Sequence, residues 1–324
     1  MTVSTERAAP FSIAFEDVVT NIERVIRGKR SAVELAVICL FAEGHLLVED
    51  VPGLGKTTLA RSLAASVNAG CHRIQFTPDL LPADITGTNV FNQRAGEFAF
   101  RPGPVFANLV IGDEINRASP KTQSALLEVM EERLVTVDGT RRPVPLPFMV
   151  IATQNPVDMD GTYALPEAQL DRFLMRLRVG YPTLEAELQI LEGRQVGRRV
   201  EDLRPVMRAE DVAAHAEWTL GIHVAPEMRR YIVRVVAATR SRRDAVRLGA
   251  SPRGSVALLR AAQVRAAAAG RAYVTPDDVS ALAGPVLAHR LVLSPEAELR
   301  RLTAEDVIAE VLDTVPSPRR LVSA

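Results

Sequence analysis

The first half of the chain alternates between short apolar runs and longer stretches in which apolar residues recur with helical spacing. The middle runs are almost entirely apolar, as strands buried on both faces are, whereas residues 174–179 alternate between apolar residues and arginine, as an edge strand does. Such alternation of strands and helices predicts an α/β fold with a parallel five-stranded sheet covered by helices on both faces. The predicted strands are residues 45–48, 73–76, 107–111, 148–153 and 174–179, and the predicted helices are residues 31–42, 58–67 and 121–131.

Two segments break this alternation and predict inserted β-hairpins. In residues 89–104, two pairs of apolar residues flank a polar turn. In residues 133–147, Asp138 and Gly139 separate an apolar alternation from a proline-rich return, and Asp-Gly in that setting is a strong hairpin signal. The apolar residues of the first hairpin are Val90, Phe91, Phe98 and Phe100.

Composition changes after residue 182, where Ala, Arg, Leu and Val with helical spacing replace the strand pattern. Residues 228–239 and 254–268 are the clearest helices, and Thr275 before Pro276 has the residues of a helix N-cap. The arginines of these helices are expected on a solvated face. The sequence therefore predicts an α/β core at residues 1–182, with both hairpins inserted in it, and a helical domain at residues 183–324.

Length, charge and cysteine usage exclude several classes of protein. The 324 residues suggest about two domains, and 39 basic against 39 acidic residues give no global field that would recruit nucleic acid or a membrane. Residues 1–10 lack the apolar segment of a signal peptide, and residues 36–42 are too short an apolar stretch to span a bilayer. Cys39 and Cys71 lack metal-ligand spacing, so we expect a reduced, cytoplasmic protein without a membrane span.

Residues 50–57 form the pattern of a phosphate-binding loop between a predicted strand and a predicted helix. A glycine-rich turn at a helix N-terminus points backbone N–H groups at a polyphosphate, Lys56 can reach the β- and γ-phosphates, and the Thr57 hydroxyl can bind Mg²⁺. The loop departs from the usual G-x-x-x-x-G-K-[ST] pattern because Asp50 replaces the first glycine. The predicted nucleotide contacts here are Pro52, Gly53, Leu54, Gly55, Lys56, Thr57 and Thr58.

Polar residues follow two of the buried strands, at the sheet edge where α/β proteins bind ligands. Asp113 is predicted to hold Mg²⁺ together with Thr57, and Glu114 is predicted to activate the attacking water as a general base. Asn155 is predicted to orient that water, provided that its strand lies between the Asp113 strand and the phosphate-loop strand. Arg253 begins a helix of the second half, from which a guanidinium can swing to a phosphate.

These motifs occur in the order and spacing of AAA+ ATPases, and the chain resembles the MoxR family in particular. The similar phrases lie at residues 49–57, 113–118, 152–156 and 165–173, and the resemblance covers residues 15–311. It implies a P-loop αβα sandwich with a C-terminal helical lid. By the same resemblance Asp50 is a family-like variant of the loop.

The resemblance also implies roles for individual residues. Residues 50–57 and 111–114 correspond to Walker A and Walker B, Asn155 to sensor 1, and Arg253 to sensor 2, with ATP and Mg²⁺ bound in the cleft between the two domains. Adenine is expected near Gly28. Arg172 corresponds to an arginine finger that enters the neighbouring subunit's site, which implies a ring-shaped homo-oligomer with a hexamer as the expected form.

MoxR-like proteins are regarded as ATPases that assemble or activate protein complexes, often with von Willebrand factor A domain partners. A protein client is therefore favoured, with the hairpin aromatics either gripping a polypeptide or packing on their own domain. Neither hairpin combines dense positive charge with stacking aromatics, so a nucleic-acid track is disfavoured. A nucleic-acid or chelatase-type motor, and a nucleotide-dependent switch with little turnover, stay open as alternatives.

Overall fold

The computed structural model describes residues 8–51, 53–94, 96–155, 162–185, 187–188, 191 and 199–318. Its central sheet has five parallel strands in the order β2-β5-β8-β1-β9. All five predicted strands are therefore confirmed, and the alternating last strand lies at an edge as predicted. The strands are β1 (Leu46–Glu49), β2 (Cys71–Gln75), β5 (Leu109–Asp113), β8 (Met149–Gln154) and β9 (Met175–Leu177).

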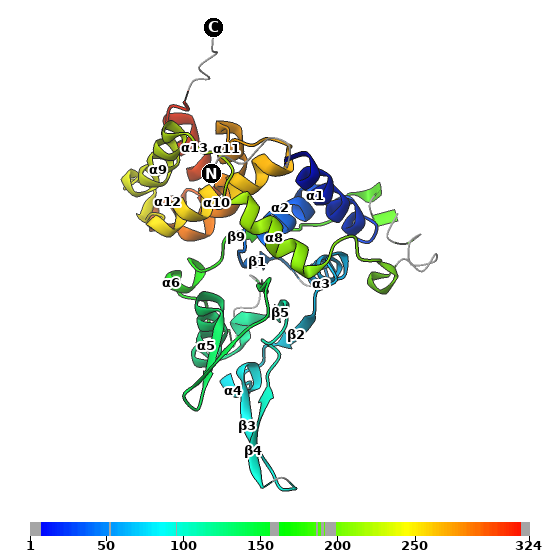
Figure 1. Ribbon diagram of the computed structural model, residues 1–324. Helices are drawn as coiled ribbons and strands as arrows, with labels where there is room; N and C mark the ends of the chain where they lie inside the picture. The colour runs from blue at the N-terminus through cyan, green and yellow to red at the C-terminus, as the bar shows by residue number, and fades with distance from the viewer. Residues whose placement is uncertain are drawn as a thin grey trace.

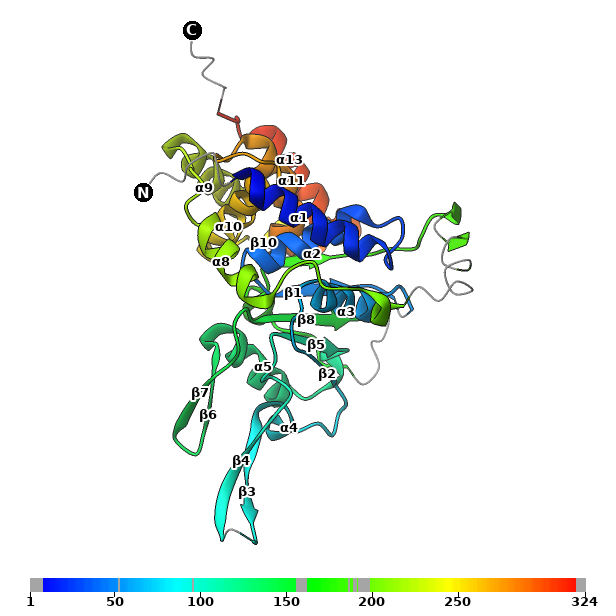
Figure 2. The same ribbon diagram turned by 45° about the vertical axis from the view of Figure 1, so that its right-hand side comes forward.

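The sheet lies between two layers of helices, as the alternation of side chains along its buried strands requires. In β1, Leu46 and Val48 belong to one hydrophobic cluster with α2 and α3, whereas Leu47 belongs to a second cluster with α5. The chain is thus an αβα sandwich (Figures 1 and 2). The helices are α2 (Arg30–Phe41), α3 (Lys56–Ser66) and α5 (Pro120–Glu132), which confirm the three predicted helices within two residues at each end.

An N-terminal helix that our sequence analysis missed, α1 (Ala8–Glu23), packs against α2 and against the helical domain. Its apolar residues recur at helical spacing, so the signal was present in the sequence. Phe11 makes an edge contact with Phe41 of α2, with ring centroids 5.1 Å apart. The buried side chains are Phe11, Phe15, Val18, Val19 and Ile22.

Both predicted hairpins are present and project from the same side of the core (Figure 2). A hydrogen bond of 2.6 Å from the Asn89 side chain to Asp138 joins the first hairpin to the turn of the second. The short helix α4 (Pro82–Thr86) leads into the first hairpin. The hairpin strands are β3 (Gly87–Asn92) with β4 (Glu97–Pro102), and β6 (Leu134–Val137) with β7 (Thr140–Pro143).

The second half is mainly helical, as predicted, and Thr275 is the N-cap residue of α11. A small antiparallel ladder, β10 (Val246–Leu248) with β11 (Val292–Leu293), was not predicted, because strands this short carry no periodicity. The helices of this half are α8 (Ala209–Thr219), α9 (Pro226–Ser241), α10 (Pro252–Ala268), α11 (Pro276–Leu287), α12 (Pro295–Leu299) and α13 (Ala304–Thr314), with 3-10 turns η3 (Val200–Asp202) and η4 (Ala288–Arg290). The short helix α6 (Glu167–Leu170) and the 3-10 turn η2 (Ile115–Arg117) belong to the core.

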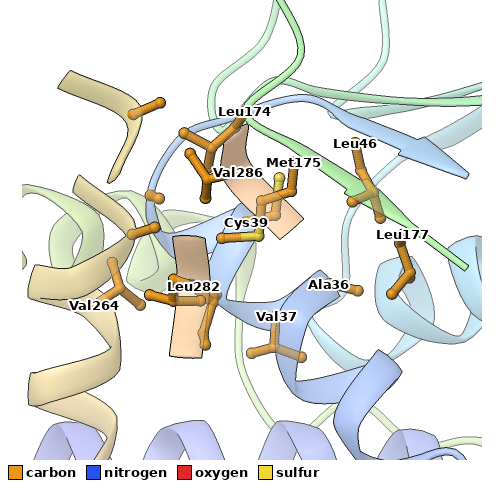
Figure 3. Packing of buried hydrophobic residues seen from close by; sticks show 14 of the residues in the cluster. Ala36, Val37, Cys39, Leu46, Leu174, Met175, Leu177, Val264, Leu282 and Val286 are labelled. Atoms are coloured by element: carbon orange, nitrogen blue, oxygen red, sulfur yellow. The ribbon is translucent and has the colours of Figure 1, made fainter. Parts of the chain in front are cut away.

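One continuous hydrophobic cluster joins the core to the helical domain. Figure 3 shows Cys39 of α2 between β9, which contributes Met175, and the helical domain, which contributes Leu282 of α11. Cys39 is fully buried, and this burial raises the pKa of its thiol, so it is a neutral core residue. The boundary at residues 182 and 183 stays a prediction, because packing is continuous across it. Along the described ranges, no helix is long and apolar enough to cross a membrane.

Candidate nucleotide-binding site

The loop between β1 and α3 has the backbone shape that phosphate binding needs. Gly53 and Gly55 have φ angles of +86° and +82°, a region that side chains with a Cβ rarely adopt. Gly55 is the N-cap residue of α3, which begins at Lys56, so the free N–H groups of the first helical turn open at the loop. Pro52, one of the predicted contacts, lies outside the described residues. The glycines are therefore needed for backbone conformation at both positions.

Lys56 is held against the loop by backbone oxygens. Its Nζ donates to the Asp50 carbonyl oxygen at 2.6 Å and lies 3.5 Å from that of Gln154. Partial burial lowers the pKa of Lys56, and the carboxylates of Asp50, Asp113 and Glu114 oppose this effect. The ammonium group thus stands at the mouth of the loop, close to three acidic side chains.

The unusual Asp50 has a structural contact in place of a phosphate contact. Its carboxylate accepts a hydrogen bond of 2.6 Å from the Gly180 backbone N–H and another of 3.0 Å from that of Val51. Gly180 follows β9, so Asp50 ties the exit of the edge strand to the start of the phosphate loop. A glycine could not make this connection, which explains why this chain tolerates an acidic residue beside a predicted polyphosphate.

Thr57 and Asp113 lie together, as a shared metal site requires. The Thr57 hydroxyl lies 3.2 Å from Asp113 Oδ2, and the Thr153 hydroxyl donates to Asp113 Oδ1 at 3.1 Å. Arg73 Nε forms an ion pair with Asp113 at 2.6 Å. A hydroxyl and a carboxylate are oxygen ligands of the kind that Mg²⁺ prefers alongside nucleotide phosphates. The described residues contain no group of three or more His, Cys, Asp or Glu that could hold a metal without such phosphates.

Glu114 adopts a left-handed backbone conformation, with a φ of +58°, directly after β5. Its backbone N–H donates to the Thr153 hydroxyl at 3.0 Å. Its carboxylate accepts hydrogen bonds from the Gln75 side chain at 3.2 Å and from Arg117 at 3.0 Å. One hydroxyl of β8 therefore fixes both Asp113 and Glu114 at the end of β5.

The role predicted for Asn155 required its strand to lie between the strand of Asp113 and the strand before the phosphate loop. The sheet has this order, because β8 lies between β5 and β1. Asn155 is buried and directly follows Gln154, whose carbonyl oxygen accepts from the Asp50 backbone N–H at 3.2 Å. The end of β8 thus contacts the phosphate loop on one side and Asp113 on the other. Sequence motifs from three strands meet at one edge of the sheet.

A pocket of about 230 Å³ adjoins the loop. It lies beside Gly28, where adenine is expected, but all its lining residues precede residue 183. This differs from the expected cleft between the two domains. The lining residues are Val25, Ile26, Arg27, Lys29, Gly53, Leu54, Gly55, Thr58, Val179, Gly180 and Pro182.

The two predicted phosphate-binding arginines, Arg172 and Arg253, lie together but away from the loop. Both form ion pairs with Glu131, at 3.0 Å and 2.5 Å. Met130 directly precedes Glu131, and its carbonyl oxygen lies 3.0 Å from the ring of His45, the residue before β1. The arginines are therefore near the amino end of β1. Because the phosphate loop follows the other end of β1, Arg253 does not lie at the loop of its own chain, contrary to the expectation of a cleft closed by the helical domain.

Sequence reasoning missed three residues that shape this site, namely Arg73, Thr153 and Arg117. It also missed Glu131, which pairs with the two arginines away from the loop. Thr153 precedes the predicted water-orienting residue by two positions, so strand alternation could have placed it on the same side. Arg73, Arg117 and Glu131 carry no such signal, since a single charged residue is usually a solvated one.

Comparison with known proteins decides the family. The family model described as "ATPase family associated with various cellular activities (AAA)" matches residues 45–175, and the family model of an AAA lid domain matches residues 237–311. Chaperone MoxR1 of Mycobacterium tuberculosis is 42% identical over 94% of this chain and 82% of its own length. The chain belongs to the MoxR family of AAA+ ATPases. The protein YeaC of Bacillus subtilis is similar too, at 49% identity over 93% of each chain.

Solved structures agree with the MoxR-family fold. The crystal structure of a Cytophaga hutchinsonii protein described as a candidate ATPase matches with a TM-score of 0.90 and 35% identity, over 97% of this chain and 98% of that one. The predicted AAA+ architecture, an αβα sandwich with a helical lid, is therefore confirmed.

Proposed function

We propose that this MoxR-family protein binds ATP with Mg²⁺ at the β1–α3 loop and hydrolyses it. The observation that carries the proposal is the meeting of Lys56, Thr57, Asp113 and Glu114 at one sheet edge, joined through the hydroxyls of Thr57 and Thr153. Adenine would lie in the adjoining pocket near Gly28. Phosphoryl transfer depends mostly on positioning and charge stabilisation, and this arrangement supplies both.

Each residue has a distinct part in this proposal. Thr57 and Asp113 would hold Mg²⁺, which neutralises charge on the phosphate oxygens when it is bound. Glu114 accepts the proton of the attacking water, and Asn155, buried at the end of β8, orients that water. Arg73 now pairs with the carboxylate assigned to the metal, so this ion pair would have to loosen when ATP and Mg²⁺ bind.

We infer a ring of subunits, with six as the expected number, from the positions of Arg172 and Arg253. Both lie near the amino end of β1, whereas the phosphate loop lies beyond its carboxyl end. A single subunit therefore cannot bring them to its own ATP without a large rearrangement. In a head-to-tail ring the same arginines reach the ATP of the neighbouring subunit, where guanidinium groups stabilise the charge that develops on the phosphates.

The first test is replacement of Lys56 by alanine, which is expected to prevent ATP binding at ordinary assay concentrations. Loss of a hydrogen bond to a charged group costs about 1.5–3 kcal/mol, or about 10- to 100-fold in affinity. Titration calorimetry with ATP and Mg²⁺ measures the change. Lys121→Ala is the matched control, because Lys121 is an exposed lysine of α5 that does not line the pocket proposed for adenine. Undiminished affinity in the Lys56 variant would remove the phosphate-loop assignment.

Remodelling of partner proteins is the proposed use of hydrolysis, in a cytoplasmic setting. The first hairpin exposes Val90, Phe91 and Phe98, with 47%, 50% and 71% of their surfaces accessible. Phe100 packs on its own molecule instead, against Phe106 and under the Arg142 guanidinium. Packing on its own domain therefore applies to Phe100, whereas gripping of a polypeptide by the other three side chains stays a proposal. The three exposed side chains suit contact with an apolar polypeptide. A role on partner proteins is also supported by a relative, which is named Chaperone MoxR1.

Stimulation of the ATPase by different partners tests this use. We expect a von Willebrand factor A domain protein to raise the rate, and single-stranded or duplex DNA to leave it unchanged. Phosphate release is measured with each partner, for the native chain and for Phe98→Ser. A rise with DNA alone that fades as salt increases would favour the nucleic-acid motor, because such contacts release counterions.

A further inference from the structure

Glu131 is the one described residue that binds both predicted phosphate-binding arginines. Its Oε2 pairs with Arg172 Nη2 at 3.0 Å, and its Oε1 pairs with Arg253 Nη2 at 2.5 Å. Glu131 lies in the last turn of α5, whereas Arg172 follows α6 and Arg253 begins α10 of the helical domain. A single carboxylate therefore brings together guanidinium groups from two parts of the fold.

The surroundings fix both arginines beyond this shared contact. Arg172 Nη1 also donates to the Leu127 carbonyl oxygen at 2.7 Å, one turn earlier on α5. The neighbouring Asp171 accepts from the Ser251 hydroxyl at 2.8 Å, and Ser251 in turn caps α10 at the backbone N–H of Arg253. The start of α10 is thus attached to the residue beside Arg172.

A buried arginine completes this joint between the helical domain and the core. Arg290 has only 3% of its side chain exposed and pairs with the Asp171 carboxylate. It also donates to the Phe173 carbonyl oxygen at 2.6 Å. Loss of one partner of a buried ion pair strongly destabilises a fold, because the other charge stays buried without compensation. Because Asp171 precedes Arg172 and also binds Ser251 at the start of α10, these contacts place Arg172 and Arg253 beside each other at Glu131.

We propose that Glu131 is a positioning residue that presents Arg172 and Arg253 as one pair to the ATP of a neighbouring subunit. Two guanidinium groups repel each other, and the carboxylate between them offsets that repulsion. The two guanidinium groups and the Glu131 carboxylate together carry one net positive charge, so the group still attracts a polyphosphate. This inference rests on the proposed ring, in which both arginines act on the neighbour's site.

Replacing Glu131 by glutamine tests the proposal. We expect kcat to fall about 10- to 100-fold, the loss that a displacement of about 1 Å can cause at a reacting centre. The affinity of each subunit for ATP is expected to stay unchanged, because the phosphate loop is untouched. Glu131→Asp keeps the charge on a shorter side chain, and we expect it to recover part of the lost rate.

Glu132→Gln is the matched control. Glu132 is the next residue of α5 and lines the same pocket of about 260 Å³ as Glu131 and Arg172, but it forms no ion pair with any described residue. The Glu132→Gln substitution therefore removes one negative charge from the same pocket and leaves the ion pairs of the arginines in place. We expect kcat to change by less than about twofold. Thermal unfolding and sedimentation of both variants report whether folding and assembly are preserved.

A double variant shows whether Glu131 acts through the arginines. In an Arg172→Ala background, Glu131→Gln should lower kcat by less than it does alone, since contacting residues are not additive. Equal kcat in Glu131→Gln and Glu132→Gln, with Arg172→Ala still impaired, would overturn the positioning role and leave the proposed function standing. A higher kcat in Glu131→Gln would overturn it too, because the carboxylate would then restrain the arginines. If Arg172→Ala keeps the native rate, the trans arginines themselves fail and the inference falls with them.

Discussion

Replacing Arg172 by alanine is expected to lower the ATPase rate of the assembled protein by about 10³- to 10⁵-fold, the range found for arginines that act on a partner's phosphoryl-transfer site. Within the described part of the chain, the Arg172 side chain binds the Leu127 carbonyl oxygen and Glu131, which both lie on α5. Its loss should therefore leave the phosphate loop and ATP affinity intact. Steady-state phosphate release, with ATP affinity measured in parallel, separates the two effects. Arg230→Ala, an exposed arginine of α9, is the control.

Mixed assemblies decide whether Arg172 acts within its own subunit or on its neighbour. An Arg172→Ala subunit keeps its phosphate loop, and a Lys56→Ala subunit keeps its arginine. When the two alternate in a ring, one kind of interface regains both parts, so the mixture should hydrolyse ATP although neither variant does so alone. Absence of recovery, in mixtures shown by sedimentation to co-assemble, contradicts the trans role.

Replacing Glu114 by glutamine is expected to slow hydrolysis by about 10²- to 10⁴-fold while ATP still binds. Glutamine has nearly the same size as glutamate, so its side-chain oxygen can still accept hydrogen bonds from Gln75 and Arg117, although the negative charge is removed. It cannot accept the proton of the attacking water. Single-turnover phosphate release measures the chemical step directly, and titration with ATP reports binding.

The same experiment separates an ATPase from a nucleotide-dependent switch. Glu128→Gln is the control, because Glu128 is an exposed acidic residue of α5. If the native protein and the Glu114 variant release phosphate at equal rates, the switch with little turnover is favoured. If only the Glu114 variant is slow, the general-base role stands.

Local sequence patterns determined most of the fold. The five sheet strands and both hairpins follow from apolar runs and turn residues, which depend on near neighbours in the chain. The ends of the five sheet strands moved by up to two residues, as in β2, which begins at Cys71 and not at Arg73. The second hairpin ends at Pro143, four residues before its predicted end. The helix α1 was missed although Phe11 and Phe15 have the spacing of a helix face, and the β10–β11 ladder was missed because its strands are too short to show a period.

The phosphate loop was predictable for the same local reason, since one short segment contains Gly53, Gly55, Lys56 and Thr57. Asp113, Glu114 and Asn155 were predictable as residues that end buried strands. The order β5-β8-β1 brought them to one place, and that order was assumed from the sequence and settled by strand pairing. Their assigned roles in catalysis stay predictions, to be tested by the variants above.

Only the tertiary structure decided where the arginines lie. Arg172, Arg253 and Glu131 are separated by up to 122 positions along the chain, and no local pattern links them. Their meeting depends on how the helical domain packs on the core through Asp171 and Arg290. Long-range ion pairs depend on the packing of whole elements. The sequence by itself therefore determined the loop that is predicted to bind the nucleotide, at one end of β1. Tertiary packing determined the arrangement near the other end of β1, where Glu131 pairs with two arginines.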